Sequence, residues 1–299
     1  MRSVDARSPA LPQRKDGRAR HLRTTARTAA VALRSWVALL VFSALPLAAT
    51  AAFEHEHTAW STLLQKHVVL RDAGKSSAVS YAGFARDRSQ LKTYLGALSA
   101  VPESEFNAWS KPQQLAFLIN AYNAFTIEKV LMRYPDIRSI RDFGKLIGNP
   151  WKDRFFTLFG RDATLDGIEH DMIRVAGRYD DPRIHFAVNC ASIGCPMLRE
   201  EAYVATRLDA QFDEQALRFM SDRTRNRYDT SARKLALSSI FDWYGKDFAR
   251  GWKGYTSLDQ WLARYADQLA DKPEDRAAIR GGGVPVTFLD YDWRLNDAR

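Results

Sequence analysis

Both cysteines of the chain and one histidine lie within a single short segment, residues 184–196. Alternating side chains predict a strand from Ile184 to Asn189, which would place His185 on its polar face. A turn would follow this strand. Because proline is favoured at the first position of a helix, Pro196 indicates that Cys195 caps a helix. A thiol at that position would feel the helix dipole, which favours the thiolate.

Several kinds of chemistry are open to the two cysteines. In an exported chain, Cys190 and Cys195, separated by four residues, are most simply a local disulfide. Alternatively, a helix N-terminus or the imidazole of His185 could lower the pKa of a catalytic thiol. The spacing H-x4-C-x4-C matches no standard zinc pattern, so we expect no metal and no cofactor. The spacing also differs from C-x-x-C, which disfavours thiol–disulfide exchange.

Two further groups of polar residues are candidates for the same site. His170 lies in a predicted short helix that follows a predicted hairpin at residues 155–165, and it is a second candidate base. Its neighbour Glu169 is expected to point elsewhere on that helix. Asn120 and Asn123 lie on one face of an apolar helix, where a buried amide without partners costs about 1 to 3 kcal/mol. They either hold loop backbone by hydrogen bonds or line a pocket.

The elements that position these side chains are mostly helical. Ser110 to Gln113 form a capping box, which opens a helix running to about Arg133. Apolar residues cover nearly every direction of this helix, so we expect it to be the central buried helix. Further elements are expected as follows: helices around residues 208–220 and 241–244 and after Ser257, a strand over residues 234–237, and a C-terminal strand within residues 284–293 that pairs with an early element.

These elements together predict the fold class. We expect a single α+β domain that is mostly helical and has a small, largely antiparallel sheet. The sheet should contain both the strand of His185 and the C-terminal strand. About 248 residues remain after the expected cleavage, and neither an internal repeat nor a Gly/Ser-rich linker divides them.

The N-terminus has the pattern of a secretory signal. An arginine-rich leader precedes an apolar run from Ser35 to Leu47, and Ala49 to Ala51 fit the A-x-A cleavage rule. We therefore expect residues 1–51 to be a signal peptide with an extended basic leader, and residues 52–299 to be a periplasmic or secreted domain. The apolar run is short for a membrane span and no later segment could cross a bilayer, so no transmembrane span is expected after signal removal.

The distribution of charge argues against a nucleic-acid partner. The chain has a formal net charge of +9, but residues 1–51 hold eight Arg, one Lys and two Asp, which amounts to +7. Only +2 is left for the remainder of the chain. Binding to nucleic acid would require basic residues clustered on the folded domain rather than in a leader.

Four motifs follow one another along the chain: FLINAYNA at residues 117–124, IEH at 168–170, HFAVNCASIGCP at 185–196 and YDW at 291–293. In this order they resemble the family catalogued as domain of unknown function 547 (DUF547). The resemblance runs from about Thr93 to Asn296. It implies a bacterial exported protein, from a family whose plant members carry the same domain behind a coiled-coil segment, and it implies no particular reaction.

Two functions are therefore open from the sequence. The first is a disulfide-stabilised, exported domain that binds a small molecule or an envelope protein without catalysis. The alternative is a thiol-dependent hydrolase or acyl transferase, in which Cys195 or Cys190 attacks a carbonyl. His185 or His170 would take the thiol proton. Asn120 or Asn123 would then orient the imidazole or bind the oxyanion.

Overall fold

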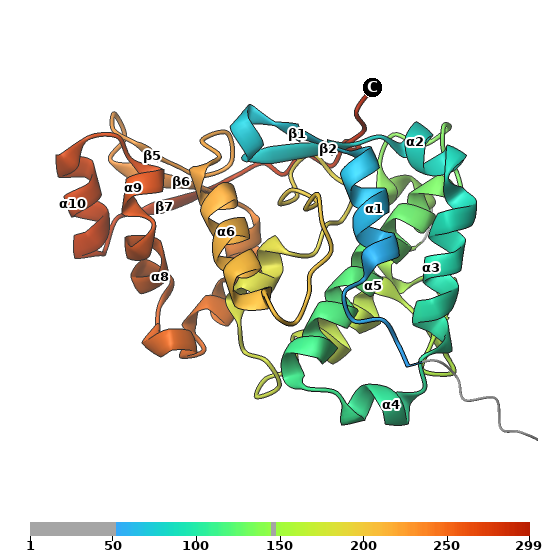
Figure 1. The fold of residues 1–299 in the computed structure, drawn as a ribbon. Coiled ribbons are helices and arrows are strands. Elements are labelled where there is room, and N and C mark those ends of the chain that lie inside the picture. The colour runs from blue at the N-terminus through green and yellow to red at the C-terminus, as the bar shows by residue number, and fades with distance from the viewer. Residues whose placement is uncertain (1–51, 145–147) are drawn as a thin grey trace, which may run out of the picture. The chain divides into compact units, whose positions relative to one another are not determined.

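The computed structural model describes residues 52–144 and 148–299, so the predicted signal segment, residues 1–51, lies outside the described residues. The described part is mostly helical and carries small sheets (Figure 1). Its α-helices are α1 (Thr58–His67), α2 (Tyr81–Arg86), α3 (Arg88–Ala100), α4 (Glu103–Ala108), α5 (Lys111–Leu131), α6 (Leu208–Ser221), α7 (Ile240–Tyr244), α8 (Leu258–Arg264), α9 (Ala266–Leu269) and α10 (Pro273–Gly281). Its strands are β1 (Val68–Arg71), β2 (Ser76–Val79), β3 (Phe156–Leu158), β4 (Arg161–Ala163), β5 (Arg227–Asp229), β6 (Lys234–Ser238) and β7 (Val286–Leu289).

Helix α5 is the central buried helix that its sequence predicts. The capping box is present, because Ser110 Oγ accepts from the Gln113 N–H at 3.4 Å and Gln113 Oε1 accepts from the Ser110 N–H at 3.0 Å. All residues from Gln114 to Leu131 are buried. A helix that is apolar on every side must be covered on every side. Helices α2 and α3 and a π-helix at Gly167–Ile173 pack against it.

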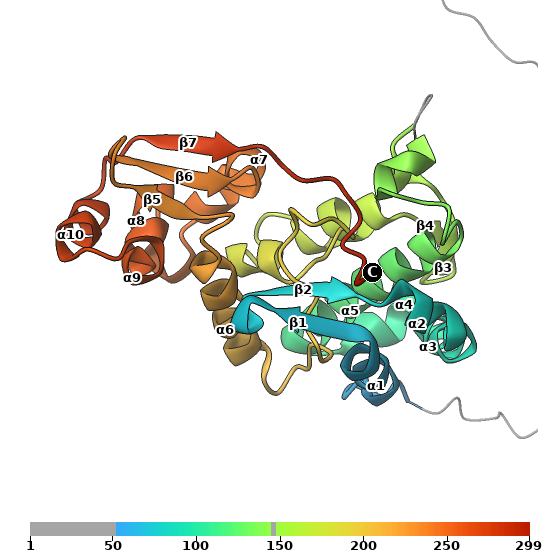
Figure 2. The same ribbon diagram turned by 90° about the horizontal axis from the view of Figure 1, so that it is seen from above.

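The strands form small sheets that are largely antiparallel, as expected. β1 pairs with β2, β3 with β4 and β5 with β6 in antiparallel fashion, whereas β7 pairs with β6 in parallel, with Leu235 opposite Val286. The expectation that the C-terminal strand pairs with an early element is wrong for β7. The chain beyond it returns to the β1–β2 hairpin instead, where Asp297 forms a single bridge with Val79 (Figure 2).

The segment that carries both cysteines is not the predicted strand, so no strand of His185 belongs to any of these sheets. Pro182–Phe186 form a 3-10 helix, which Asp181 begins by accepting from the Arg183 N–H at 3.0 Å. The alternation was misleading, because the segment passes between two apolar cores and is buried on both faces. Ile184, Ala187 and Val188 pack into the core around α5, while Phe186 packs into the core of the C-terminal part.

Cys195 does not cap a helix either. Residues 195–199 have no regular secondary structure, and the Cys195 N–H donates to Ser192 O at 3.1 Å within a turn. The expected influence of a helix dipole on this thiol is therefore wrong. Pro196 is compatible with a helix start but does not by itself produce one, because proline is equally suited to extended segments.

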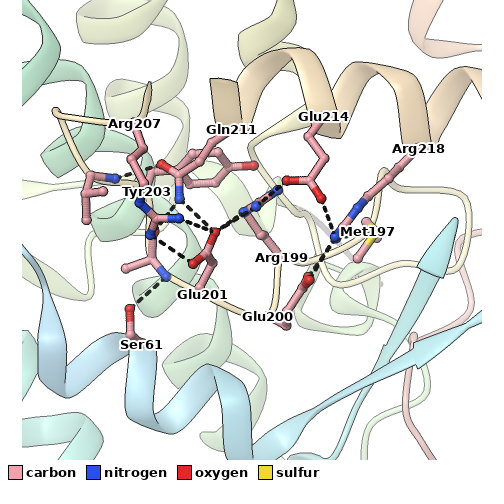
Figure 3. A network of polar contacts seen from close by, with 12 residues as sticks. Ser61, Met197, Arg199, Glu200, Glu201, Tyr203, Arg207, Gln211, Glu214 and Arg218 are labelled. Atoms are coloured by element: carbon pink, nitrogen blue, oxygen red, sulfur yellow. Dashed lines mark hydrogen bonds and ion pairs between the residues drawn. The ribbon is translucent and has the colours of Figure 1, made fainter. Parts of the chain in front are cut away.

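A network of arginine and acidic side chains fastens the chain after Cys195 to helix α6 (Figure 3). The buried Arg199 bonds to Glu201 at 2.7 Å and to Glu214 at 2.6 Å. Arg218 bonds to Glu214 at 2.7 Å, which links the arginines through a shared carboxylate. Gln215 Nε2 also donates to Met197 O at 2.8 Å. These contacts hold the loop that follows the cysteines in one position.

The two asparagines of α5 hold loop backbone by hydrogen bonds, which confirms the first of the two interpretations above. Asn120 Nδ2 donates to Tyr203 O at 2.7 Å, and its Oδ1 accepts from the Tyr203 N–H at 3.0 Å. Asn123 Nδ2 donates to Ala187 O at 2.9 Å, and its Oδ1 accepts from the Asn189 N–H at 2.8 Å. Each amide is therefore satisfied by backbone on both sides. Asn123 in particular holds the segment between His185 and Cys190.

We expect Asn120→Leu and Asn123→Leu each to lower the free energy of unfolding by about 1 to 3 kcal/mol, because each change leaves buried backbone groups without a partner. Asn107→Leu, which makes the same change at an exposed position, is the matched control and should stay within about 0.5 kcal/mol of the parent. Chemical denaturation measures all three. Stabilities of the α5 variants equal to that of the control would contradict this role.

Candidate functional site

A cavity of about 260 Å³ brings together four of the six candidate residues: His170, His185, Cys190 and Cys195. Asn120 and Asn123 are not among the residues that line it. The lining comes from α5, the π-helix, the segment 185–196, α7, the C-terminal segment and a loop at residues 149–151. The other lining residues are Tyr122, Asn149, Trp151, Asp166, Glu169, Val188, Pro196, Ile240, Trp243, Tyr244, Tyr291 and Trp293.

Both cysteines are free thiols, so the expected Cys190–Cys195 disulfide has no support in the structure. They are nevertheless direct neighbours, since the Cys190 N–H donates to Cys195 Sγ at 2.8 Å. Cys190 is half-buried, whereas Cys195 is fully buried. The two thiols therefore differ in their access to the cavity and in their surroundings.

Hydrogen bonds distinguish the chemistry of the two thiols. Cys190 Sγ lies 3.2 Å from both Ser192 Oγ and Tyr291 Oη. Burial raises the pKa of Cys190, but hydrogen bonds from Cys195, Ser192 and Tyr291 outweigh burial and bring it below its ordinary value. Burial and the neighbouring Cys190 instead hold the pKa of Cys195 well above its ordinary value. Cys190 is thus the better nucleophile, and Cys195 is the proton-bearing neighbour.

The C-terminal motif contributes to this arrangement because it packs directly on the cysteine turn. The Gly194 N–H donates to Asp292 O at 2.9 Å, and the Ile193 N–H donates to Arg294 O at 2.8 Å. A Cβ atom at Gly194 would lie 3.0 Å from Asp292 N and 3.1 Å from the Tyr291 ring. Glycine at this position therefore permits the close approach that brings the Tyr291 hydroxyl to Cys190.

His185 is paired with Asp247, a residue that the sequence did not indicate. His185 Nε2 lies 2.8 Å from Asp247 Oδ2, and the imidazole stacks on Tyr244 with ring centroids 4.2 Å apart. Burial lowers the pKa of His185, although the hydrogen bond to Asp247 opposes this effect. If Nε2 donates to the carboxylate, Nδ1 of the neutral imidazole remains free to accept a proton.

Asp247 is held in its charged form. Burial raises its pKa, but hydrogen bonds to His185 and Arg174 outweigh burial and place the pKa well below its ordinary value. Arg174 Nε lies 2.8 Å from Asp247 Oδ2, and Arg250 lies 2.8 Å from Oδ1. The carboxylate can therefore orient His185 and stabilise an imidazolium when one forms.

His170 is less suited to act as a base. Its Nδ1 lies 2.6 Å from Arg174 Nη1, and a guanidinium can only donate, so Nδ1 must be the acceptor. In the neutral ring the proton is then on Nε2, which lies 3.6 Å from Asp166 Oδ1. No lone pair of His170 is left for a substrate. Of the two histidines that line the cavity, His185 alone combines a carboxylate partner with an unassigned ring nitrogen.

Glu169 also lines the cavity, which corrects the expectation that it points away from the side of His170. The short helix at Gly167–Ile173 is a π-helix, whose wider turn lets adjacent side chains diverge less than on an α-helix. Glu169 is buried, and its carboxylate helps to raise the pKa of the Tyr244 hydroxyl. The IEH motif contains Glu169, but the assumption of an α-helix gave the wrong direction for its side chain.

Neither a group of metal ligands nor a membrane-spanning helix is present in the described part of the chain. Within residues 52–144 and 148–299, no cluster of three or more His, Cys, Asp or Glu side chains is arranged to hold a metal ion. In the same two ranges, every helix is too short or too polar to cross a membrane.

The fold is that of a mostly helical α+β domain. Its cavity holds two thiols and is lined by residues from all four sequence motifs. Residues 106–220 match the family described as "Protein of unknown function, DUF547", and this match supports the assignment of the chain to that family. This match contains all six candidate residues but neither Asp247 nor Tyr291, and it is shorter than the resemblance from Thr93 to Asn296. No curated protein and no solved structure matches the chain.

Proposed function

We propose that this protein is a thiol-dependent hydrolase or acyl transferase in which Cys190 is the nucleophile and His185 is the base. One observation carries the proposal: the cavity is lined both by a cysteine whose pKa is lowered and by a histidine paired with a buried carboxylate. Nucleophile, base and orienting group are the parts that covalent catalysis by a thiol requires.

The proposed reaction has two steps. His185 takes the proton of Cys190, and the thiolate attacks a carbonyl carbon of an ester or amide substrate. The carbon–oxygen or carbon–nitrogen bond breaks, and the leaving group receives the proton from His185, which leaves a thioester on Cys190. Water or an acceptor then attacks the thioester and gives its proton to His185, and the thiol is restored when the acyl group departs.

Tyr122 is a suitable donor to the oxyanion of this reaction. Burial raises the pKa of its phenol well above the ordinary value, so the hydroxyl remains protonated. The side chain projects from the rigid α5 and lines the same cavity as Cys190. A positioned hydroxyl in a site of low dielectric stabilises developing negative charge on the carbonyl oxygen.

We expect an activated ester such as p-nitrophenyl acetate to leave an acetyl group on Cys190, because the thioester is the intermediate of the proposed reaction. Intact-mass measurement followed by peptide mapping locates the adduct. His185→Ala should slow its formation by about a hundredfold or more, which is the usual contribution of a general base. Asn107→Ala, at an exposed position, is the control. Acetylation of Cys195 in place of Cys190, or an equal rate without His185, would refute the assignment.

A non-catalytic binding domain is the second candidate, and the aromatic lining of the cavity favours it. Six of the lining residues are Trp or Tyr, which present large rigid surfaces to a small molecule or to a side chain of an envelope protein. In this version the neighbouring Cys190 and Cys195 would be joined by a disulfide after export. No reactive group would then be needed.

We further propose that the protein is exported and that cleavage follows Ala51, since the leader, apolar run and small residues fit a signal peptide. Expression in a bacterium that exports the chain, followed by N-terminal sequencing, tests this. A mature protein that retains Arg34 would contradict it. The non-reduced mass of the same sample separates the two functions, because a disulfide makes it lighter by two hydrogens and prevents alkylation before reduction.

A further inference from the structure

We infer that the cavity binds a positively charged ammonium group, so that the substrate attacked by Cys190 is an ester or amide that carries an amine. The inference rests on the proposed function for the identity of the reacting group. The binding preference itself follows from the charges and rings around the cavity.

The cavity is acidic at Glu169, whose carboxylate has no cationic partner among the described residues. Glu169 is about nine-tenths buried, and no Lys or Arg of the described residues forms an ion pair with its carboxylate. Tyr244 lines the same cavity, and burial and the Glu169 carboxylate raise the pKa of its hydroxyl. Asp166 also lines the cavity, and its Oδ1 lies 3.6 Å from His170 Nε2. A buried carboxylate that faces a cavity without a counter-charge is costly, and a bound cation offsets that cost.

The cavity is also lined by a cluster of aromatic side chains. Trp243 and Trp293 stack with centroids 5.7 Å apart, and Tyr291 lies 4.8 Å from Trp243 and 4.5 Å from Trp293. Trp151 contacts Trp293 edge-on at 5.7 Å. Indole faces are the best cation–π partners among side chains. Arg141 already occupies one position of this kind, 5.0 Å from the Trp293 ring.

The charges of the described residues around the cavity disfavour an anionic ligand. Among the described residues that line the cavity, none is Lys or Arg. Arg174, the guanidinium next to His170, is already engaged by Asp247 at 2.8 Å and by His170 at 2.6 Å. A carboxylate or phosphate entering the cavity would therefore meet Glu169 and Asp166 without a compensating cation.

A bound ammonium group would also assist the reaction. The Glu169 carboxylate repels a thiolate on Cys190 and so raises the pKa of that thiol. A cation held at Glu169 would offset this repulsion and favour the thiolate when substrate is present. Substrates that carry an ammonium group would then be selected both in binding and in the attack.

Three small molecules that share a tert-butyl group test the preference: tert-butylammonium, tert-butanol and pivalate. Binding is followed by the indole N–H resonance of Trp243, assigned with Trp243→Phe. We expect the cation to bind the full-length protein about tenfold more tightly than the neutral alcohol, and pivalate to bind most weakly. Equal affinities, a preference for pivalate, or binding of none of the three would overturn the inference.

Substitutions in the cavity test which residues produce the preference for the cation over the alcohol. Glu169→Gln should reduce the advantage of the cation over the alcohol to about threefold or less, because it removes the charge and keeps the shape. Glu103→Gln, the same change at an exposed residue outside the cavity, should leave it unchanged. Trp243→Ala, at a residue 45% exposed, should weaken the cation more than the alcohol, and binding to this variant is followed by the indole N–H resonance of Trp293, which lines the same cavity. An advantage that survives both Glu169→Gln and Trp243→Ala would refute the site.

These measurements are independent of catalysis. A cation preference combined with acetylation failing at Cys190 would contradict the proposed function alone. Acetylation of Cys190 combined with a preference for pivalate would contradict the ammonium site alone.

Discussion

Cys190 is expected to react with iodoacetamide at about pH 7 roughly tenfold faster than Cys195, because a nucleophilic thiol must be ionised and only Cys190 has a lowered pKa. Cys195 is also fully buried, which restricts access of the reagent to it. Time-resolved alkylation and peptide mapping of the reduced protein measure the two rates. Cys190→Ala should remove the fast phase, and Cys195→Ala should keep a phase assigned to Cys190.

Substitution of Tyr291 tests whether hydrogen bonding lowers the pKa of Cys190. Tyr291→Phe removes the hydroxyl that lies 3.2 Å from Cys190 Sγ, so the pKa of Cys190 should rise and its alkylation should require a higher pH. Tyr228→Phe makes the same change at a tyrosine that does not line the cavity and should leave the pH profile unmoved. Fast alkylation of Cys195 instead, or a profile insensitive to Tyr291→Phe, would show that hydrogen bonding does not activate Cys190.

The largest effect on stability is expected at Asp247. Asp247→Ala removes a buried carboxylate bound by His185, Arg174 and Arg250, and should lower the free energy of unfolding by about 3 to 5 kcal/mol, the usual cost of breaking a buried pair. Its loss should also slow acetylation of Cys190, since His185 is no longer oriented. Asp267→Asn, which changes an exposed carboxylate, is the control for stability.

The pH dependence of the parent has a definite sign. The pKa of Asp247 is depressed in the folded state, so its stabilisation is present above the unfolded value of 3.8 and is lost as the pH falls below it. The pKa of His185 is depressed from 6.5, so protonation below that pH also favours unfolding. Lowering the pH therefore reduces the stability of the folded protein through both Asp247 and His185.

Asp247→Asn, which removes the charge and keeps the shape, isolates the contribution of the aspartate. Its stability should fall less steeply than that of the parent below about pH 4, because the variant has no carboxylate to protonate at this position. Thermal or urea unfolding across the pH range measures the two slopes. Parallel curves for the two proteins would contradict the assigned role of Asp247.

The sequence alone determined much of the helical frame. The sequence correctly predicts the cap at Ser110, the buried helix α5 and the hairpin β3–β4. Caps, turns and the burial of a helix depend on residues that are close together in the chain. The motifs also identified the segments that meet at the cavity. The local sequence pattern is sufficient to predict a helix or strand where that element only has to pack against apolar neighbours.

Tertiary structure alone decided which groups act together. Burial between two cores made the segment of His185 a 3-10 helix, and a turn placed Cys190 Sγ 3.2 Å from the Tyr291 hydroxyl. Asp247 lies 62 residues after His185, and no local signal joins them. Thiol pKa values and histidine pairing depend on burial and on hydrogen-bond partners that are distant in sequence, so they emerge only when the chain folds.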